Sequence, residues 1–216
     1  MRDHMPRGSS QKIITAGVYA QCYGFFPFQV RPTKTGETLG VVRLGGHREA
    51  HETGWERAAR EALEEASIHV TPIPPPTTYW VEVTDDGTFH EGAWEPSSSN
   101  EVAPIVVSTH KEEYMTPIYL GYSDDAPRPA GEAKALLLLR PRDIAQIVQG
   151  PVTLEHYLNL GGKAIFKESL PQQLLLQPFP HLRFLSLSTF VCTGCDFRLH
   201  WLSADESHKK HCKWSK

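Results

Sequence analysis

Residues 45–68 read GGHREAHETGWERAAREALEEASI, and this stretch decides how the chain is interpreted. Thr53 is followed three residues later by Glu56, a spacing typical of the capping box that begins a helix. Alanines and a leucine recur through the segment from Trp55 to Ala66, where they favour helix and can face a core. The stretch therefore predicts a short amphipathic helix entered from a pair of glycines.

Three glutamates share one face of this predicted helix. Glu61, Glu64 and Glu65 stand at i, i+3 and i+4, where like charges repel by about a few tenths of a kcal/mol per pair. Carboxylate oxygens in such a cluster are ligands for a hard divalent cation, Mg²⁺ or Mn²⁺. Gly45 and Gly46 allow the backbone to approach the ion, with the Gly45 carbonyl as a further ligand. A solvated acidic helix face is the alternative, and the glycines, the cap and a neighbouring arginine favour the metal site.

The same residues resemble the Nudix box, in which a glycine, five residues, a glutamate and seven residues precede R-E-U-x-E-E-x-G-U, with U aliphatic. The residues in register with it over positions 46–68 are Gly46, Glu52, Arg60, Glu61, Glu64, Glu65 and Ile68. Ala62 is a small residue at an aliphatic position. Ser67 replaces the glycine that normally takes a left-handed conformation after the helix, and keeping that conformation should cost about 1 kcal/mol.

The resemblance implies a hydrolase that cleaves a nucleoside diphosphate linked to a moiety X, leaving a nucleoside monophosphate and phosphorylated X. It implies that Glu61, Glu64 and Glu65 bind Mg²⁺ or Mn²⁺ with help from the Gly45 carbonyl. Arg60 is expected to orient these glutamates, and Gly46 and Glu52 to support the loop.

The general base stays open between a glutamate of the box and one of a later loop. Glu64 is the first choice within the box, and Glu132 is the first choice outside it. Weaker candidates are Glu101, Glu112 and Glu113. The alternative for each of these loop acids, Glu132 included, is an ordinary surface residue.

The box does not identify X. Sugar nucleotides such as ADP-ribose, dinucleoside polyphosphates, modified nucleoside triphosphates and capped RNA all stay open, the last as an RNA pyrophosphohydrolase of the decapping type. A different class of function is a nucleotide-sensing binding module that contacts nucleic acid or a protein partner. The intact glutamates favour the enzyme.

The whole chain has 216 residues, a formal net charge of −3 and 40% hydrophobic residues, which suits a globular protein with no general affinity for nucleic acid or acidic membranes. Residues 13–30 carry no charge. Their glutamines, proline and many β-formers predict buried strands, and a membrane or signal segment is the alternative. No membrane partner is expected, and the cytoplasm is the expected location.

Along the chain, the pattern predicts an α/β protein. With the resemblance, the expectation is a Nudix-type α/β/α sandwich with a mixed sheet. Strands are predicted at 13–23, 25–31, 39–43, 77–83, 102–109, 115–122 and 133–139, and later helices at 141–149 and 153–160. The expected division is a flexible tail at 1–11, a Nudix hydrolase domain at 12–170, a linker at 171–189 and a small zinc-finger-like module at 190–216.

That last module is predicted from cysteine spacing. Cys192 and Cys195 are followed by His208 and Cys212 in a C-x₂-C-x₁₂-H-x₃-C pattern, which is typical of a tetrahedral zinc site. A structural Zn²⁺ would supply folding free energy to a segment too short for a core of its own. His211 is a rival fourth ligand and His200 a weaker one. The alternative is a set of unlinked thiols or a disulfide, and Cys22 is expected to be a buried free thiol.

The role of the module also stays open. Over residues 181–216 the basic residues outnumber the acidic ones; they are Arg183, Arg198, Lys209, Lys210, Lys213 and Lys216 against Asp196, Asp205 and Glu206. Contact with nucleic acid is one reading. A structural cap, a protein contact or a homodimer interface is the other, and it is preferred.

Overall fold

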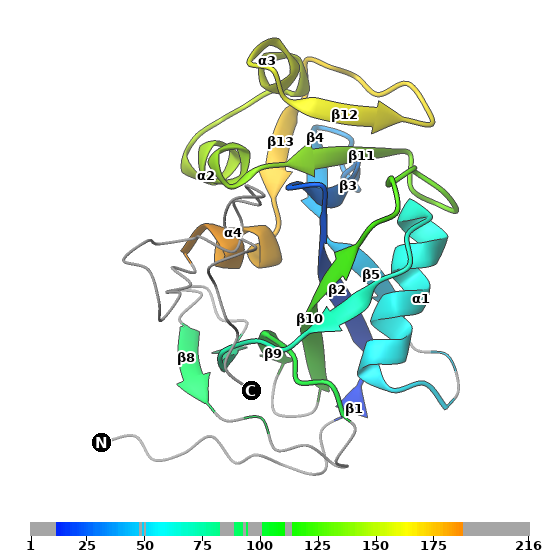
Figure 1. Cartoon of the computed structure of the whole chain (residues 1–216). Helices are drawn as coiled ribbons and strands as arrows, with labels where there is room; N and C mark the ends of the chain where they lie inside the picture. Colours follow the sequence, from blue (N-terminus) through cyan, green and yellow to red (C-terminus); the bar gives the residue numbers. More distant parts are fainter. Residues whose placement is uncertain are drawn as a thin grey trace, which may run out of the picture.

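The computed structural model describes residues 12–47, 49, 51–82, 89–92, 94, 101–110 and 114–187. The predicted tail at 1–11, the loop acids Glu112 and Glu113, and the whole zinc-finger-like module lie outside these residues. Within them the chain is a mixed α/β protein with two mixed sheets (Figure 1).

The first sheet carries the box. Its described strands are β1 (Lys12–Ile13), β2 (Thr15–Cys22), β5 (Leu44–His47), β6 (Thr71–Ile73), β7 (Thr78–Glu82), β8 (Phe89–Gly92), β9 (Val106–His110) and β10 (Tyr114–Ser123). They run in the order β5-β2-β10-β9-β7-β8, with β1 and β6 also paired to β10. β10 is parallel to β2 and antiparallel to β9, so the sheet is mixed.

The second sheet has the order β12-β11-β3-β4-β13. Its described strands are β3 (Phe26–Pro32), β4 (Thr38–Val42), β11 (Ala135–Leu139), β12 (Lys163–Phe166) and β13 (Leu175–Pro178). β13 runs parallel to β4, and the other pairs are antiparallel. One mixed sheet was expected from the sequence, whereas the described strands divide into two.

Four helices lie in the described residues: α1 (Gly54–Ala66), α2 (Pro141–Gln149), α3 (Leu154–Asn159) and α4 (Pro180–Leu187). In Figure 1, α1 runs along β2 and β5 on one side of the first sheet. α4 lies on the other side, where it contacts α2, β4 and β13. The molecule therefore buries β2 between two layers of side chains.

The uncharged run at 13–30 is explained by this double burial. Val18 and Ala20 face a cluster that includes the α1 residues Ala58 and Ala62, whereas Tyr19 faces the cluster on the opposite side. Strands covered on both faces are apolar along their whole length rather than alternating. The predicted buried strands are thus confirmed as β2 and β3, and no helix among the described residues is long and apolar enough to cross a membrane.

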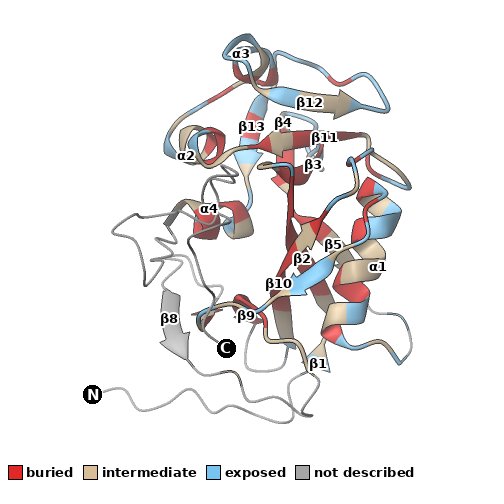
Figure 2. Ribbon diagram, viewed as in Figure 1, coloured by how far each residue is buried: buried red, intermediate tan, exposed pale blue. Residues whose placement is uncertain are grey.

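The linker predicted at 171–189 needs correction. Residues 171–187 contain β13 and α4. Leu182 and Leu185 of α4 are buried in the core, and Figure 2 colours part of α4 as buried. Phe89–Gly92, beyond β7, form β8. Pro72 lies in β6, which among the described strands pairs with β10 alone; an edge strand of this kind tolerates proline. Cys22 is a buried free thiol, as predicted.

Candidate active site

The box helix α1 begins where the sequence predicts. The Thr53 side chain accepts a hydrogen bond from the Glu56 amide at 3.2 Å, and the Glu56 carboxylate accepts one from the Thr53 amide at 2.9 Å. This reciprocal capping box satisfies donors that a helix N-terminus leaves unpaired. It fixes the start of α1 relative to the glycine loop.

Three alanines bring α1 close to the sheet. Ala58, Ala62 and Ala66 are fully buried at intervals of four residues, and they pack against β2. Gly54 at the start of the helix also lets α1 lie close to the sheet, because a Cβ there would lie 2.2 Å from the Tyr119 hydroxyl. Small side chains along one face therefore set how near the acidic residues of the helix come to β5.

Ser67 ends the helix in the left-handed conformation, with φ 54° and ψ 36°. Its amide donates to the Leu63 carbonyl at 2.9 Å, so the turn that a glycine usually makes is kept by a serine. The 128–130 loop then covers this end of the helix, with the Arg128 amide donating to the Ala66 carbonyl and the Ala130 amide to the Glu65 carbonyl.

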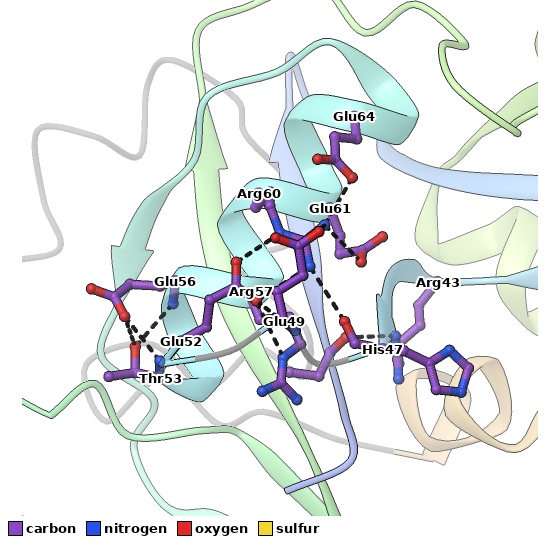
Figure 3. Close-up of polar contacts among 11 residues, drawn as sticks. Arg43, His47, Glu49, Glu52, Thr53, Glu56, Arg57, Arg60, Glu61 and Glu64 are labelled. Carbon is purple, nitrogen blue, oxygen red and sulfur yellow. Dashed lines mark hydrogen bonds and ion pairs between the residues drawn. The ribbon is translucent and has the colours of Figure 1, made fainter.

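Arg60 lies at the centre of an ion-pair network (Figure 3). Its Nε and Nη2 donate to the two carboxylate oxygens of Glu52 at 2.7 and 3.3 Å, and its Nη2 also donates to the His47 carbonyl at 3.3 Å. Its Nη1 lies 2.8 Å from Glu64 Oε2 and 3.1 Å from Glu61 Oε1. The hydrogen bond from Arg60 holds the pKa of Glu52 below its ordinary value. The loop, the helix and the outer carboxylates are thereby joined through one guanidinium.

Glu65 is held from the opposite side. Its Oε2 accepts a hydrogen bond from the Gly45 amide at 2.8 Å, and the buried Gln29 side chain also donates to it. Burial, with the nearby charge of Glu61, raises the pKa of Glu65 to about 7. Burial also raises the pKa of Glu61, although the charge of Arg60 opposes this. Two carboxylates thus lie close together in a place that disfavours their charges.

Gly46 makes room for one of them. A Cβ on Gly46 would lie 2.3 Å from Glu61 Oε1 and 2.5 Å from Glu61 Oε2, far inside van der Waals contact. Only a bare backbone lets the Glu61 carboxylate rest against β5. The site residues taken from the box therefore come together around the β5–α1 junction, with Glu61 and Glu65 inside and Glu64 outside.

The three glutamates do not converge on one point. In the part of the chain that the structure describes, no group of three or more histidine, cysteine, aspartate or glutamate side chains is arranged to hold a metal ion. Arg60 draws the Glu64 carboxylate outward, and Gly45 and Gln29 hold that of Glu65 inward. The donor chemistry nevertheless fits a hard cation, because Glu61 and Glu65 offer neighbouring, partly buried carboxylate oxygens, which are the ligands such cations take.

The loop candidates for the base differ in position. Glu132 is exposed and follows Gly131, where a Cβ would lie 2.8 Å from the Glu64 carbonyl oxygen. The backbone next to Glu132 thus lies against the last turn of α1. Glu101 lies in the segment before β9.

Sequence reasoning missed two buried polar residues behind the carboxylates. Gln29 on β3 contacts Glu65, and Arg43, between β4 and β5, carries a charge that acts on Glu65 and Glu61. Gln29 is a polar residue within a largely apolar strand and Arg43 directly follows an apolar one, and that was the available signal. Among the aromatic residues of β7, Tyr79 packs on Phe184 in the core, and Trp80 stacks on Trp94.

Comparison with known proteins gives the following similarities. No family model matches the chain, and no curated protein matches it. A NUDIX-family hydrolase from Clostridium perfringens is 21% identical, with 62% of this chain and 84% of that chain covered at a TM-score of 0.44. A C. elegans Ap4A hydrolase is 15% identical, with 64% and 88% covered at a TM-score of 0.40. A MutT protein from Bacillus halodurans is 14% identical, with 61% and 71% covered at a TM-score of 0.34.

Proposed function

We propose that this protein is a Nudix-type pyrophosphohydrolase, which uses Mg²⁺ or Mn²⁺ to cleave a nucleoside diphosphate linked to a moiety X. The observation that carries the proposal is the placement of Glu61 and Glu65. Both carboxylates are partly buried beside the Gly45–Gly46 backbone, where polar contacts from Gly45, Gln29 and Arg60 orient them. Withdrawing two neighbouring acids from water is costly unless a cation compensates them.

Glu61 and Glu65 would hold the cation together with the Gly45 carbonyl, and Glu64 would join them by turning away from Arg60. A divalent cation held there supplies charge neutralisation at the phosphate oxygens and activates a water molecule. Arg60 fixes the outer carboxylates by charge-assisted hydrogen bonds, and Glu52 fixes Arg60 in turn. Gly46 keeps the inner carboxylate against the strand.

Glu64 is proposed as the general base, because it is the most exposed of the three glutamates, with 53% of its side chain accessible. An exposed carboxylate can reach both an attacking water and the solvent that takes the proton away. Glu132 is the alternative base, since its backbone neighbour lies against the same turn of α1.

The test is a substrate panel on the full-length protein with Mg²⁺, using ADP-ribose, sugar nucleotides, dinucleoside polyphosphates, nucleoside triphosphates and capped RNA. Products are separated by chromatography for the wild type and for Glu61→Gln, Glu65→Gln and Glu64→Gln. Cleavage to a monophosphate product that is lost in the Glu61 and Glu65 variants supports the hydrolase and identifies X. Because Glu64 would also hold the cation, Glu132→Gln decides between the two bases: full activity in this variant favours Glu64, and loss of activity with unchanged Mn²⁺ affinity assigns the base to Glu132.

Nucleotide binding without turnover, in protein whose fold is intact, would replace the proposal with that of a nucleotide-sensing module. A structural zinc site is proposed separately, with Cys192, Cys195, His208 and Cys212 as its ligands. Zinc analysis of the purified protein tests it. A Zn²⁺ content near zero in reduced protein would reject that part.

A further inference from the structure

Arg43 is a buried cation directly before the box. Its exposed fraction is 6%, although charged side chains are rarely buried without a partner. Burial lowers the pKa of Arg43, and the nearby charges of Glu65 and Glu61 oppose this shift. These two neighbours are the inner carboxylates of the candidate site.

The Arg43 guanidinium joins two backbones. Its Nη1 donates to the Ala16 carbonyl on β2 at 3.1 Å and to the Leu44 carbonyl on β5 at 3.3 Å. A Cβ on Gly17 would lie 2.1 Å from this nitrogen, and a Cβ on Gly45 would lie 2.0 Å from it. Gly17 and Gly45 face each other across the two strands, so two bare backbones form the slot that the guanidinium fills.

Gly45 on β5 connects this slot to the carboxylates of the candidate site. The Gly45 backbone that packs against Arg43 also donates its amide hydrogen to Glu65 Oε2 at 2.8 Å. Any movement of β5 relative to β2 would therefore move the group that orients the Glu65 carboxylate.

We propose that Arg43 is a positioning residue, which clamps β5 to β2 and so sets the Gly45 backbone and, through it, the Glu65 carboxylate. The proposal rests on the proposed function, because the position of Glu65 matters to catalysis only where Glu65 holds the cation. Arg43 donates hydrogen bonds to the backbone carbonyls of Ala16 and Leu44, and its effect on Glu65 passes through Gly45.

Arg43→Lys is the decisive variant. Lysine keeps a positive charge but offers a point donor in place of the planar fork. A role through geometry predicts a defect in Arg43→Lys, whereas a role through charge alone predicts wild-type behaviour. Arg43→Met removes charge and donors together and gives the upper limit of the effect. Arg31→Met, at an exposed position on β3, is the matched control for losing one positive charge.

The first readout is hydrogen exchange of the Gly45 amide, followed by NMR on metal-free, full-length protein. Loss of a hydrogen bond to a charged acceptor is expected to speed exchange by about tenfold or more in Arg43→Lys. Amides elsewhere in β2 and β10 should keep their protection, which separates a local effect from general destabilisation. Unchanged Gly45 exchange in Arg43→Lys overturns the proposal, whether or not Arg43→Met folds.

The second readout is Mn²⁺ affinity, measured by electron paramagnetic resonance of free Mn²⁺ without substrate. Misplacement of Glu65 is expected to weaken binding about tenfold in Arg43→Lys and to leave Arg31→Met unchanged. Equal affinity in wild type and Arg43→Lys contradicts the proposal. A wild-type protein that binds no Mn²⁺ would reject the metal site of the proposed function, while the Gly45 exchange would still decide the role of Arg43.

Discussion

The substitution Gly46→Ala tests the geometry of the site with a single methyl group. The new Cβ would lie 2.3, 2.4 and 2.5 Å from Oε1, Cδ and Oε2 of Glu61. Ordinary contact begins near 3.4 Å, so the carboxylate must move by about 1 Å. Because the clashing atoms end a flexible side chain, we expect a stability loss of only about 1 kcal/mol, at the low end of overpacking costs.

The effect on the site should be much larger. A displacement of about 1 Å in a catalytic group can lower the rate about a hundredfold. We therefore expect Gly46→Ala to lose about two orders of magnitude in kcat/KM on the substrate found by the panel, and to bind Mn²⁺ more weakly. Urea denaturation on the same samples separates this from unfolding.

Gly150→Ala is the control for that experiment. Gly150 follows α2 with extended backbone, and a Cβ there would meet no atom within 4 Å. Its activity and its Mn²⁺ affinity should equal those of the wild type. If Gly46→Ala also keeps both within about twofold of the wild type, the reasoning that Gly46 exists to place Glu61 is refuted.

Three further predictions concern the helix and its acids. Thr53→Ala removes the side-chain half of the capping box and should lower the free energy of unfolding by about 1 kcal/mol in urea; an unchanged midpoint would reject the cap's contribution. Ser67→Gly relieves the left-handed φ of 54° and should raise that free energy by about 1 kcal/mol, so a destabilised variant would contradict it. Because burial raises the pKa of Glu65 to about 7, its neutral form is favoured by folding, and the stability of the metal-free protein should fall as pH rises from about 4.5 to 7. Glu65→Gln should lose this part of the pH dependence in thermal unfolding, and identical profiles for the two proteins would disprove the assignment.

The box helix could be predicted because its determinants are local. Thr53 and Glu56 are three residues apart, the buried alanines repeat every four residues, and Ser67 occupies the position that requires a left-handed residue. Each of these signals lies within one or two helical turns of the structure it specifies. The helix was expected at 55–66 and begins one residue earlier, at Gly54.

The inner side of the site could not be predicted, because its contacts are distant in sequence. Gln29 reaches Glu65 from the second sheet, and Arg43 donates to Ala16, 27 residues away. No local sequence pattern around Gln29 or Arg43 predicts which residues they contact. Only the tertiary structure brings these two buried residues close to the carboxylates.

The misassigned linker has a similar cause. Residues 171–180 contain several glutamines and prolines around a short apolar run, a composition typical of a connection. The run becomes β13 because Leu176 pairs with Leu39 of β4, and α4 follows because Leu182 and Phe184 have a core to enter. Both requirements arise from the tertiary structure, which the local composition does not contain.

The central claim is that water attacks phosphorus at the β5–α1 junction with a cation held by Glu61 and Glu65. The most direct test is turnover of the substrate found by the panel in ¹⁸O-labelled water with Mg²⁺, with products analysed by mass spectrometry. We predict one labelled oxygen in one of the two phosphate products for the wild type, and no labelled product for Glu61→Gln or Glu65→Gln. Unchanged labelling in both variants, or no labelled product from the folded wild type with any substrate of the panel, would contradict the account.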